Sequence, residues 1–338
     1  MNRKFGAGIQ ILAAAVVIGL VAAAWLGWAP GRAPTGPPEK LTIAVPRYIG
    51  GSAILVAHSM GYFKQQNLDV ELQMHSSGRA ALDSLLDGKA DLAVAADTPV
   101  VFAATSGRRL LIVATLASQI RDQGIVARRD HGIAALADLR GKRIGVTTGT
   151  SAHYCLDATL LDQKIAASAV TIVGLKPEEL APALAGGTVD AVATWNPYLE
   201  SSLRAVHDHG AEFSGAIACA YTFNLAARPD LVKAKPVLIE KALRALAEAD
   251  SYMKEHPAAA QQLVANAIGA DAAWVAREWS NYPLRLALEQ TLLRRLEDES
   301  RWVSRVGAAQ GPAVPDFLDY VYVDALAAVS PKSVTVIR

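Results

Sequence analysis

Apolar and polar positions follow a pattern from residue 41 onward that occurs twice along the chain. In the first copy, the apolar run LTIAV precedes a helical pattern, the alternating strand LDVELQM, a second helical pattern and the buried run DLAVAA. The second copy begins with KRIGV and repeats this order as far as DAVAT. Strands that alternate with helices predict βαβαβ units. We therefore predict an α/β chain with two doubly wound parallel sheets.

The two copies also share sequence where the second helix leads into the third strand. LLDGKADLAVA aligns without a gap on ALAGGTVDAVA, which matches Gly88 with Gly187 and Asp91 with Asp190. This alignment supports two units of nearly equal size.

Two further apolar segments, 110–130 and 216–230, follow the first and the second copy. Each is apolar enough for a buried strand and is placed to cross between the two halves. The remaining 231–338 has almost entirely helical periodicity. We expect lobe 1 to comprise 41–118 with 231–338, lobe 2 to comprise 119–230, and the crossing segments to form a hinge.

The N-terminus carries a long apolar segment without charged residues, which Arg3 and Lys4 precede. A bilayer core needs roughly 20 apolar residues. Trp25 and Trp28 stand at the far end of the segment, where interfacial aromatic residues belong. We predict that residues 1–31 form a signal or membrane anchor.

The alternative to a retained anchor is a secretory signal peptide that is cleaved near the alanines at 22–24. Both alternatives place the rest of the chain in the periplasm, and we favour an anchor in the inner membrane. The proline-rich stretch 32–40 is then an extended linker.

Composition narrows the classes of partner. The 338 residues have a formal net charge of +1, and no basic stripe with interleaved aromatic residues occurs, so no nucleic acid is expected. Neither the phosphate-binding P-loop pattern nor GxGxxG is present. Two cysteines, Cys155 and Cys219, are too few for a disulfide framework and lack the CxxC spacing of a metal or redox site. We expect no cofactor and no metal.

The stretch RIGVTTGTSAHY, at 143–154, predicts a strand that runs through a loop of small residues into a helix. Such a junction presents unpaired N–H groups and the positive end of a helix dipole, which suits an anion. Thr148, Gly149, Thr150 and Ser151 would supply backbone and hydroxyl donors. The alternative is that Thr150 or Ser151 only caps the helix.

Four segments resemble the solute-binding proteins of nitrate, sulfonate and taurine ABC importers, within the thiamine-pyrimidine-synthase-like superfamily. They are GYFKQQNLDVEL, SSGRAALDSLLDGKADLAVAADTPV, DLRGKRIGVTTGTSAHY and VDAVATWNPYL. The resemblance implies a two-lobed periplasmic binding protein fold of the second type, capture of a solute between the lobes, and delivery to an ABC permease with its ATPase. The superfamily also contains binders of a thiamine-precursor pyrimidine, a pyrimidine synthase and a desulfinase, so the fold alone does not identify the ligand.

Ligands of open α/β sheets bind at the carboxyl ends of the strands. In this chain those ends are the loops 46–53, 76–79, 97–99, 147–152 and 195–198. We expect ligand contacts from these loops and from the crossing segments, at Arg47, Ser52, Ser77, Thr98, Ser118, Gln119, Thr148, Gly149, Thr150, Ser151, His153, Trp195 and Tyr221.

Several of these residues have alternative interpretations. Arg47 is preferred to Arg79 as the partner of an anion, although either could be a solvated surface arginine. Asp97 could hold an ammonium group of a zwitterion such as taurine, or it could cap its own helix. Trp195 and His153 could contact the ligand or only contribute to packing.

The function we expect is that of an exported, monomeric solute-binding component of an ABC importer, which holds a small anion such as a sulfonate, taurine or nitrate. An enzyme would need a nucleophile or a cofactor lysine in the cleft. His153 and Cys155 are two positions apart on a helix and therefore point in different directions, so they form no local dyad. A sensor or scaffold would carry an additional signalling module. The sequence leaves the identity of the solute open.

Overall fold

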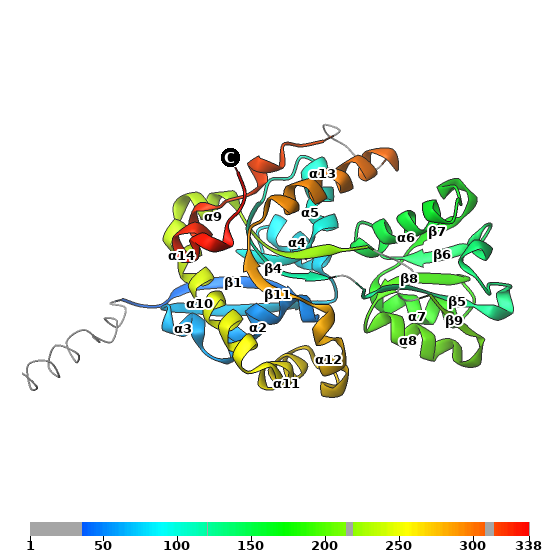
Figure 1. Ribbon diagram of the computed structural model, residues 1–338, viewed down its shortest axis with the longest axis horizontal. Helices are drawn as coiled ribbons and strands as arrows, with labels where there is room; N and C mark the ends of the chain where they lie inside the picture. Colours follow the sequence, from blue (N-terminus) through cyan, green and yellow to red (C-terminus); the bar gives the residue numbers. More distant parts are fainter. Residues whose placement is uncertain (1–35, 120, 214–218, 308–313, 338) are drawn as a thin grey trace, which may run out of the picture. The chain divides into compact units, whose positions relative to one another are not determined.

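Two β-sheets and the helices between their strands make up the part of the chain that this computed structural model describes, residues 36–119, 121–213, 219–307 and 314–337. The first sheet contains β1 (Glu39–Pro46), β2 (Leu68–His75), β3 (Leu92–Ala96), β4 (Leu111–Gln119), β10 (Tyr221–Ala227) and β11 (Leu284–Ala287). The second sheet contains β5 (Gln123–Arg128), β6 (Arg143–Val146), β7 (Thr171–Gly174), β8 (Ala191–Trp195) and β9 (Gly210–Glu212). The strand orders are β11-β4-β10-β3-β1-β2 and β7-β6-β8-β5-β9. Figure 1 shows the two sheets with their helices. The predicted α/β architecture with two sheets is confirmed.

The first three strands of each copy form the same parallel arrangement. β1 pairs in parallel with β2 and β3, and β6 pairs in parallel with β7 and β8. Every residue of β3 and β8 is buried, as is usual for parallel strands that are covered on both faces. The two predicted βαβαβ units are therefore present.

The sheets are mixed, however, and not wholly parallel as predicted. β10 lies antiparallel between β3 and β4, and β5 lies antiparallel between β8 and β9. The reason is the direction of the crossing. β4 runs towards the carboxyl edge of the first sheet, so the chain enters the second sheet at its carboxyl edge and must run back along it. The return through β10 follows the same rule.

Helices occupy the connections and the C-terminal third of the chain. The first copy holds α2 (Ser52–Ser59), α3 (Tyr62–Gln65), α4 (Gly78–Leu86) and α5 (Asp97–Thr105), and the second holds α6 (Ser151–Asp162), α7 (Pro177–Ala185) and α8 (Tyr198–Val206). The C-terminal helices are α9 (Pro229–Ala234), α10 (Pro236–Glu255), α11 (Pro257–Ile268), α12 (Ala272–Glu278), α13 (Gln290–Arg305) and α14 (Asp324–Val329). α10 packs against α2 and α14, while α13 packs against α5 (Figure 1). The predicted helical character of this region holds except for the short edge strand β11.

The aligned acidic residues have the same structural role in both copies. The Asp91 carboxylate accepts a hydrogen bond from the N–H of Thr42 in β1 over 2.9 Å, and the Asp190 carboxylate accepts one from the N–H of Arg143 in β6 over 2.8 Å. Gly88 and Gly187 both have positive φ, 74° and 70°. The internal duplication is thus visible in the hydrogen bonds.

The expected lobe boundaries agree only partly with the sheets. The segment 110–130 does cross, since it contains β4 of the first sheet and β5 of the second. β10, which we expected in lobe 2, pairs in the first sheet. We therefore propose that the division between the lobes precedes Tyr221.

The expected anchor or signal over 1–31 lies outside the described residues, as do residues 32–35 of the expected linker 32–40. The end of that linker differs from the prediction because β1 begins at Glu39. Among the helices of the described ranges, none has the length and apolar character that a membrane span requires.

Candidate functional site

A cavity of about 400 Å³, including its open mouth, lies at the carboxyl ends of strands from both sheets. Each of the five loops expected to surround a ligand contributes to its wall. The lining residues are Pro46, Tyr48, Ser76, Ser77, Gly78, Arg79, Ala96, Pro99, Thr150, Ser151, Trp195, Tyr221 and Phe223. Of the predicted site residues, the structure brings together Ser77, Thr150, Ser151, Trp195 and Tyr221 at this wall.

The first helix end at the cavity belongs to α4. Its N-cap is Ser77, whose hydroxyl oxygen accepts a hydrogen bond from the Ala80 N–H over 3.2 Å. A side chain on Gly78 would approach the backbone of Ala95 to 3.2 Å, so glycine lets the helix start close to β3. The leading N–H groups of α4 therefore stand at the cavity wall without intrahelical acceptors.

The second helix end belongs to α6, from the opposite sheet. Thr150 occupies its N-cap position, but the Thr150 side chain makes no capping hydrogen bond. The hydroxyl donates instead to the carbonyl oxygen of Thr147 over 2.6 Å. The alternative in which Thr150 is a side-chain cap therefore does not describe this loop.

Arg79 is the charged residue of the wall, in place of the preferred Arg47. Its Nη1 donates to the carbonyl oxygen of Thr148 over 2.8 Å. Gly149 has a φ of 72°, and a Cβ there would overlap Nη1 of Arg79. Glycine is thus favoured by the backbone conformation itself, and a Cβ at this position would displace the end of the flexible Arg79 side chain. Arg47 is exposed and does not line the cavity.

Aromatic rings form the apolar part of the wall. The ring of Phe223 lies 5.5 Å from that of Tyr48 and 5.4 Å from that of Tyr221, measured between centroids. Trp195 packs edge-on against Tyr198 at 5.7 Å. These contacts hold flat apolar surfaces opposite the polar helix ends.

A buried carboxylate stands behind this wall. The hydroxyl of Tyr221 lies 2.8 Å from both oxygens of Asp122, and the hydroxyl of Tyr282 donates to the same group over 2.9 Å. Burial raises the pKa of Asp122 to about 7, although the two phenols oppose this rise. Nothing in the sequence singled out Asp122, because its environment is created by residues distant along the chain.

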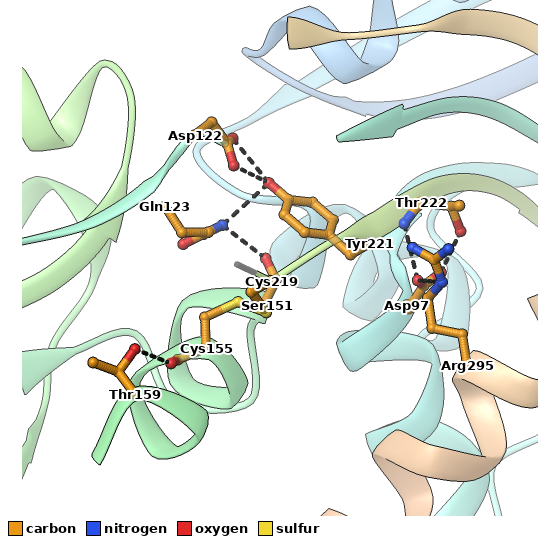
Figure 2. The surroundings of a disulfide bond; sticks show 10 residues. All are labelled: Asp97, Asp122, Gln123, Ser151, Cys155, Thr159, Cys219, Tyr221, Thr222 and Arg295. Atoms are coloured by element: carbon orange, nitrogen blue, oxygen red, sulfur yellow. Dashed lines mark hydrogen bonds and ion pairs between the residues drawn. A yellow bond between two sulfur atoms is a disulfide. The ribbon is translucent and has the colours of Figure 1, made fainter. Parts of the chain in front are cut away.

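The two cysteines form a disulfide, which the sequence reasoning missed. Cys155 in α6 is bonded to Cys219, two residues before Tyr221 (Figure 2). The bond attaches α6 of the second sheet to the start of β10. Two cysteines that are 64 positions apart carry no local signal for pairing. Within the described ranges, no group of three or more His, Cys, Asp or Glu residues is arranged to hold a metal ion.

Other predicted site residues lie near the cavity but not in its wall. The Ser52 hydroxyl donates to the carbonyl of Ile49 at the start of α2, and Thr98 is buried in the first turn of α5. The ring of His153 packs edge-on against Trp302 at 5.2 Å, and burial lowers the pKa of His153. His153 Nδ1 also accepts a hydrogen bond from the N–H of Gly149 over 3.4 Å, so the structure shows both packing and a bond to the loop for His153.

Three other predicted residues border other cavities. Gly149 lines a neighbouring cavity on the far side of Arg79. Ser118 and Gln119 line a third cavity, together with Arg295 on α13. The structure therefore does not bring these predicted residues together with the helix ends.

Asp97 adopts neither of its two expected roles. Its carboxylate accepts hydrogen bonds from the N–H and the hydroxyl of Thr222 and from the Asn224 amide over 2.7 Å, and it lies 3.6 Å from the Arg295 guanidinium. No side-chain cap closes the start of α5. Asp97 fastens α5 to β10 and does not line the solute cavity (Figure 2).

Comparison with known proteins identifies the family to which this chain belongs. The family model described as NMT1/THI5 like matches residues 51–260, and the chain belongs to this family. Over 251 residues it is 25% identical to a protein of Escherichia coli (strain K12) assigned as an aliphatic sulfonates-binding protein. The alignment covers 73% of this chain and 77% of that protein. A taurine-binding periplasmic protein of the same strain is 28% identical over 40% of this chain and 42% of its own length.

Solved structures show the fold. The alkanesulfonate-binding protein SsuA from Xanthomonas axonopodis pv. citri, bound to MOPS, matches with a TM-score of 0.72 at 21% identity, over 86% of this chain and 100% of its own. The desulfurization enzyme DSZB matches with a TM-score of 0.65 at 18% identity, over 87% and 99%. The protein therefore has the two-sheet α/β fold of periplasmic binding proteins, a fold that also carries an enzyme.

Proposed function

We propose that this protein is the exported solute-binding component of an ABC importer and that the cavity holds a small organic anion, with a sulfonate group as the most suitable head. One observation carries the proposal. The N-termini of α4 and α6, from opposite sheets, meet at one cavity whose wall also includes Arg79. Helix N-termini and arginine both favour negative charge.

The charge of the wall supports an anion over a cation. Arg79 is the one charged side chain among the described residues that line the cavity, and no carboxylate lines it. Ser77, Thr150 and Ser151 add hydroxyl groups around the helix ends. A sulfonate only accepts hydrogen bonds at its three oxygens and suits such a set of donors.

The aromatic wall supports an organic solute over a bare inorganic ion. Tyr48, Trp195, Tyr221 and Phe223 offer apolar surface beside the donors, and burial of the carbon atoms of a ligand against such surface is favourable. The relatives whose names describe sulfonate or taurine binding are in agreement with this class. The partners in this proposal are an ABC permease and its ATPase, and the compartment is the periplasm.

The enzyme alternative comes from the likeness to DSZB. The lining residues include neither His nor Lys, and the sulfur of Cys155 is bonded to Cys219. Ser77 and Ser151 have no histidine at the wall to act as their base. We therefore propose capture of the solute without chemical change.

A thermal-shift titration of the full-length protein tests the proposal. We expect alkanesulfonates and taurine to raise the melting temperature with concentration, because a ligand that binds only the folded state stabilises it. Nitrate, bicarbonate and a thiamine-precursor pyrimidine serve as the competing classes. A shift with the pyrimidine and none with any sulfonate would assign the cavity to a different solute.

A further inference from the structure

A chain of buried hydrogen bonds leads from the link between β4 and β5 to the wall of the cavity (Figure 2). The Tyr221 hydroxyl lies 2.8 Å from each oxygen of Asp122. Gln123 Nε2 lies 3.1 Å from the Tyr221 hydroxyl and 3.2 Å from the Ser151 hydroxyl. Tyr221 and Ser151 line the cavity, whereas Asp122 and Gln123 lie behind them. The chain therefore connects a buried carboxylate to the polar wall.

An ionised carboxylate at one end gives every hydrogen bond of this chain a direction. Because the Asp122 carboxylate only accepts, the Tyr221 hydroxyl must donate to it. The Tyr221 oxygen then accepts from Gln123, and the second hydrogen of the Gln123 amide nitrogen goes to the oxygen of Ser151. The Ser151 proton is then available to a group in the cavity, with the Tyr221 oxygen as its competing acceptor.

We propose that Asp122 is a positioning residue for the solute, which acts through Tyr221 and Gln123 to present the Ser151 hydroxyl as a hydrogen-bond donor to an anion in the cavity. This inference rests on the proposed function.

Protonation of Asp122 reverses the donor and acceptor roles along this series of hydrogen bonds. A protonated carboxyl donates one hydrogen bond, and when Tyr221 accepts it, the phenol proton turns towards Gln123. Gln123 Oε1 has no hydrogen-bond partner among the described residues, so the amide can turn over and accept. Ser151 then donates to this amide oxygen, and an acceptor-only solute loses its donor. Since burial raises the pKa of Asp122 to about 7, both forms are present near neutral pH.

The two phenols that form hydrogen bonds to Asp122 keep their protons in this range. The phenols of Tyr221 and Tyr282 have pKa values raised well above the usual value by burial and by Asp122 itself. Tyr48 reaches Asp122 only through its hydrogen bond to Tyr282. Glu278 of α12 adds negative charge, which raises the pKa of Asp122 further.

Direct charge repulsion predicts the opposite pH dependence. An ionised Asp122 repels an anion, so repulsion alone would tighten binding as Asp122 is protonated. The series of hydrogen bonds predicts instead that protonation of Asp122 lowers the affinity for the anion. The sign of the pH dependence therefore decides between the two effects.

Isothermal titration calorimetry of the full-length protein with ethanesulfonate, between pH 6.5 and 8.5, measures that sign. The sulfonate keeps its charge over this range. Burial lowers the pKa values of His75 and His153 from their usual value, so these histidines stay largely neutral. We expect the affinity of the unmodified protein to fall about fourfold from pH 8.5 to pH 6.5, the loss that follows when only the ionised form binds.

Three variants make the test specific. Asp122→Asn and Ser151→Ala should each give a flat pH profile, and Ser151→Ala should also bind more weakly at pH 8.5. Ser202→Ala removes a fully buried hydroxyl in α8 that forms no hydrogen bond with the described residues, and it should keep the profile of the unmodified protein.

A flat or inverted profile of the unmodified protein, or a pH dependence that survives in Ser151→Ala, overturns the inference even where variants fold poorly. Ethanesulfonate binding with such a profile leaves the proposed function standing. Absence of sulfonate binding at every pH overturns both.

Discussion

The guanidinium of Arg79 donates a hydrogen bond from Nη1 to the carbonyl oxygen of Thr148 over 2.8 Å, and so joins a helix of the first sheet to a loop of the second. The Arg79 side chain keeps 42% of its surface exposed. Its Nε lies 3.9 Å from the Asp83 carboxylate, and the residue lines the wall of the solute cavity. One residue therefore connects the two halves, and in the proposed function it also offers its charge to the bound anion.

Replacement of Arg79 should weaken anion binding. We expect Arg79→Ala to lower the affinity for an alkanesulfonate at least tenfold, because a hydrogen bond to a charged group contributes about 1.5–3 kcal/mol. Arg79→Lys should restore part of the loss, since lysine keeps the charge but not the planar fork. Arg140→Ala is the matched control, because Arg140 bonds the carbonyl of Lys164 on an exposed part of the second lobe. Calorimetry that gives Arg79→Ala the unmodified affinity would contradict this role.

A comparison of variants at two glycines distinguishes the effect of backbone strain from the effect of moving Arg79. Gly149 and Gly141 have similar positive φ values, 72° and 77°, but only at Gly149 would a Cβ overlap Arg79. We expect Gly149→Ala and Gly141→Ala each to lose roughly 1–2 kcal/mol of stability in urea unfolding. Only Gly149→Ala should also lose affinity for the solute. Equal affinity in both variants would show that Arg79 can act from another position.

The disulfide should stabilise the fold. Cys155 and Cys219 close a loop across a separation of 64 positions, and a bond of this kind typically contributes about 2–4 kcal/mol. We expect reductant to lower the free energy of unfolding of the unmodified protein in guanidinium denaturation. The double variant Cys155→Ser with Cys219→Ser should be equally destabilised and should no longer respond to reductant. A response that persists in the double variant would point to a cause other than this bond.

The raised pKa of Asp122 makes a further prediction about stability. Its folded value of about 7 lies above the ordinary value near 3.9, so between these pH values the folded state holds more protons than the unfolded state. The free energy of unfolding should therefore decrease as pH rises from 4 to 7, by at most about 4 kcal/mol from this group. Guanidinium melts at pH 5 and pH 8 should show a smaller difference for Asp122→Asn. An identical difference in both proteins would mean that Asp122 does not titrate in this range.

The βαβαβ succession of the two units and the position of the cavity followed from local patterns. The aligned Asp91 and Asp190 indicated a duplication, and both carboxylates accept a hydrogen bond from the first strand of their copy. The five loops at the carboxyl ends of the strands do surround the cavity, because strand direction alone determines where those ends lie.

Side-chain roles that depend on distant partners could not be predicted. Asp97 accepts hydrogen bonds from Thr222 and Asn224, which are more than a hundred positions away in the sequence. The two roles considered from the sequence, helix cap and ligand contact, therefore did not include the role that the structure shows. Arg47 and Arg79 both lie in cavity loops, and only the orientation of the side chain separates them. The direction of β10 likewise depends on how the chain returns from the second sheet.

Equilibrium dialysis tests the central claim most directly. The full-length protein is dialysed against a mixture of sulfonates, taurine, nitrate and the pyrimidine, and the contents of both chambers are then measured by mass spectrometry. The account predicts that one organic anion is retained at one equivalent per chain and that its total amount stays unchanged. Retention of no anion, or consumption of the solute with release of a product, would contradict it.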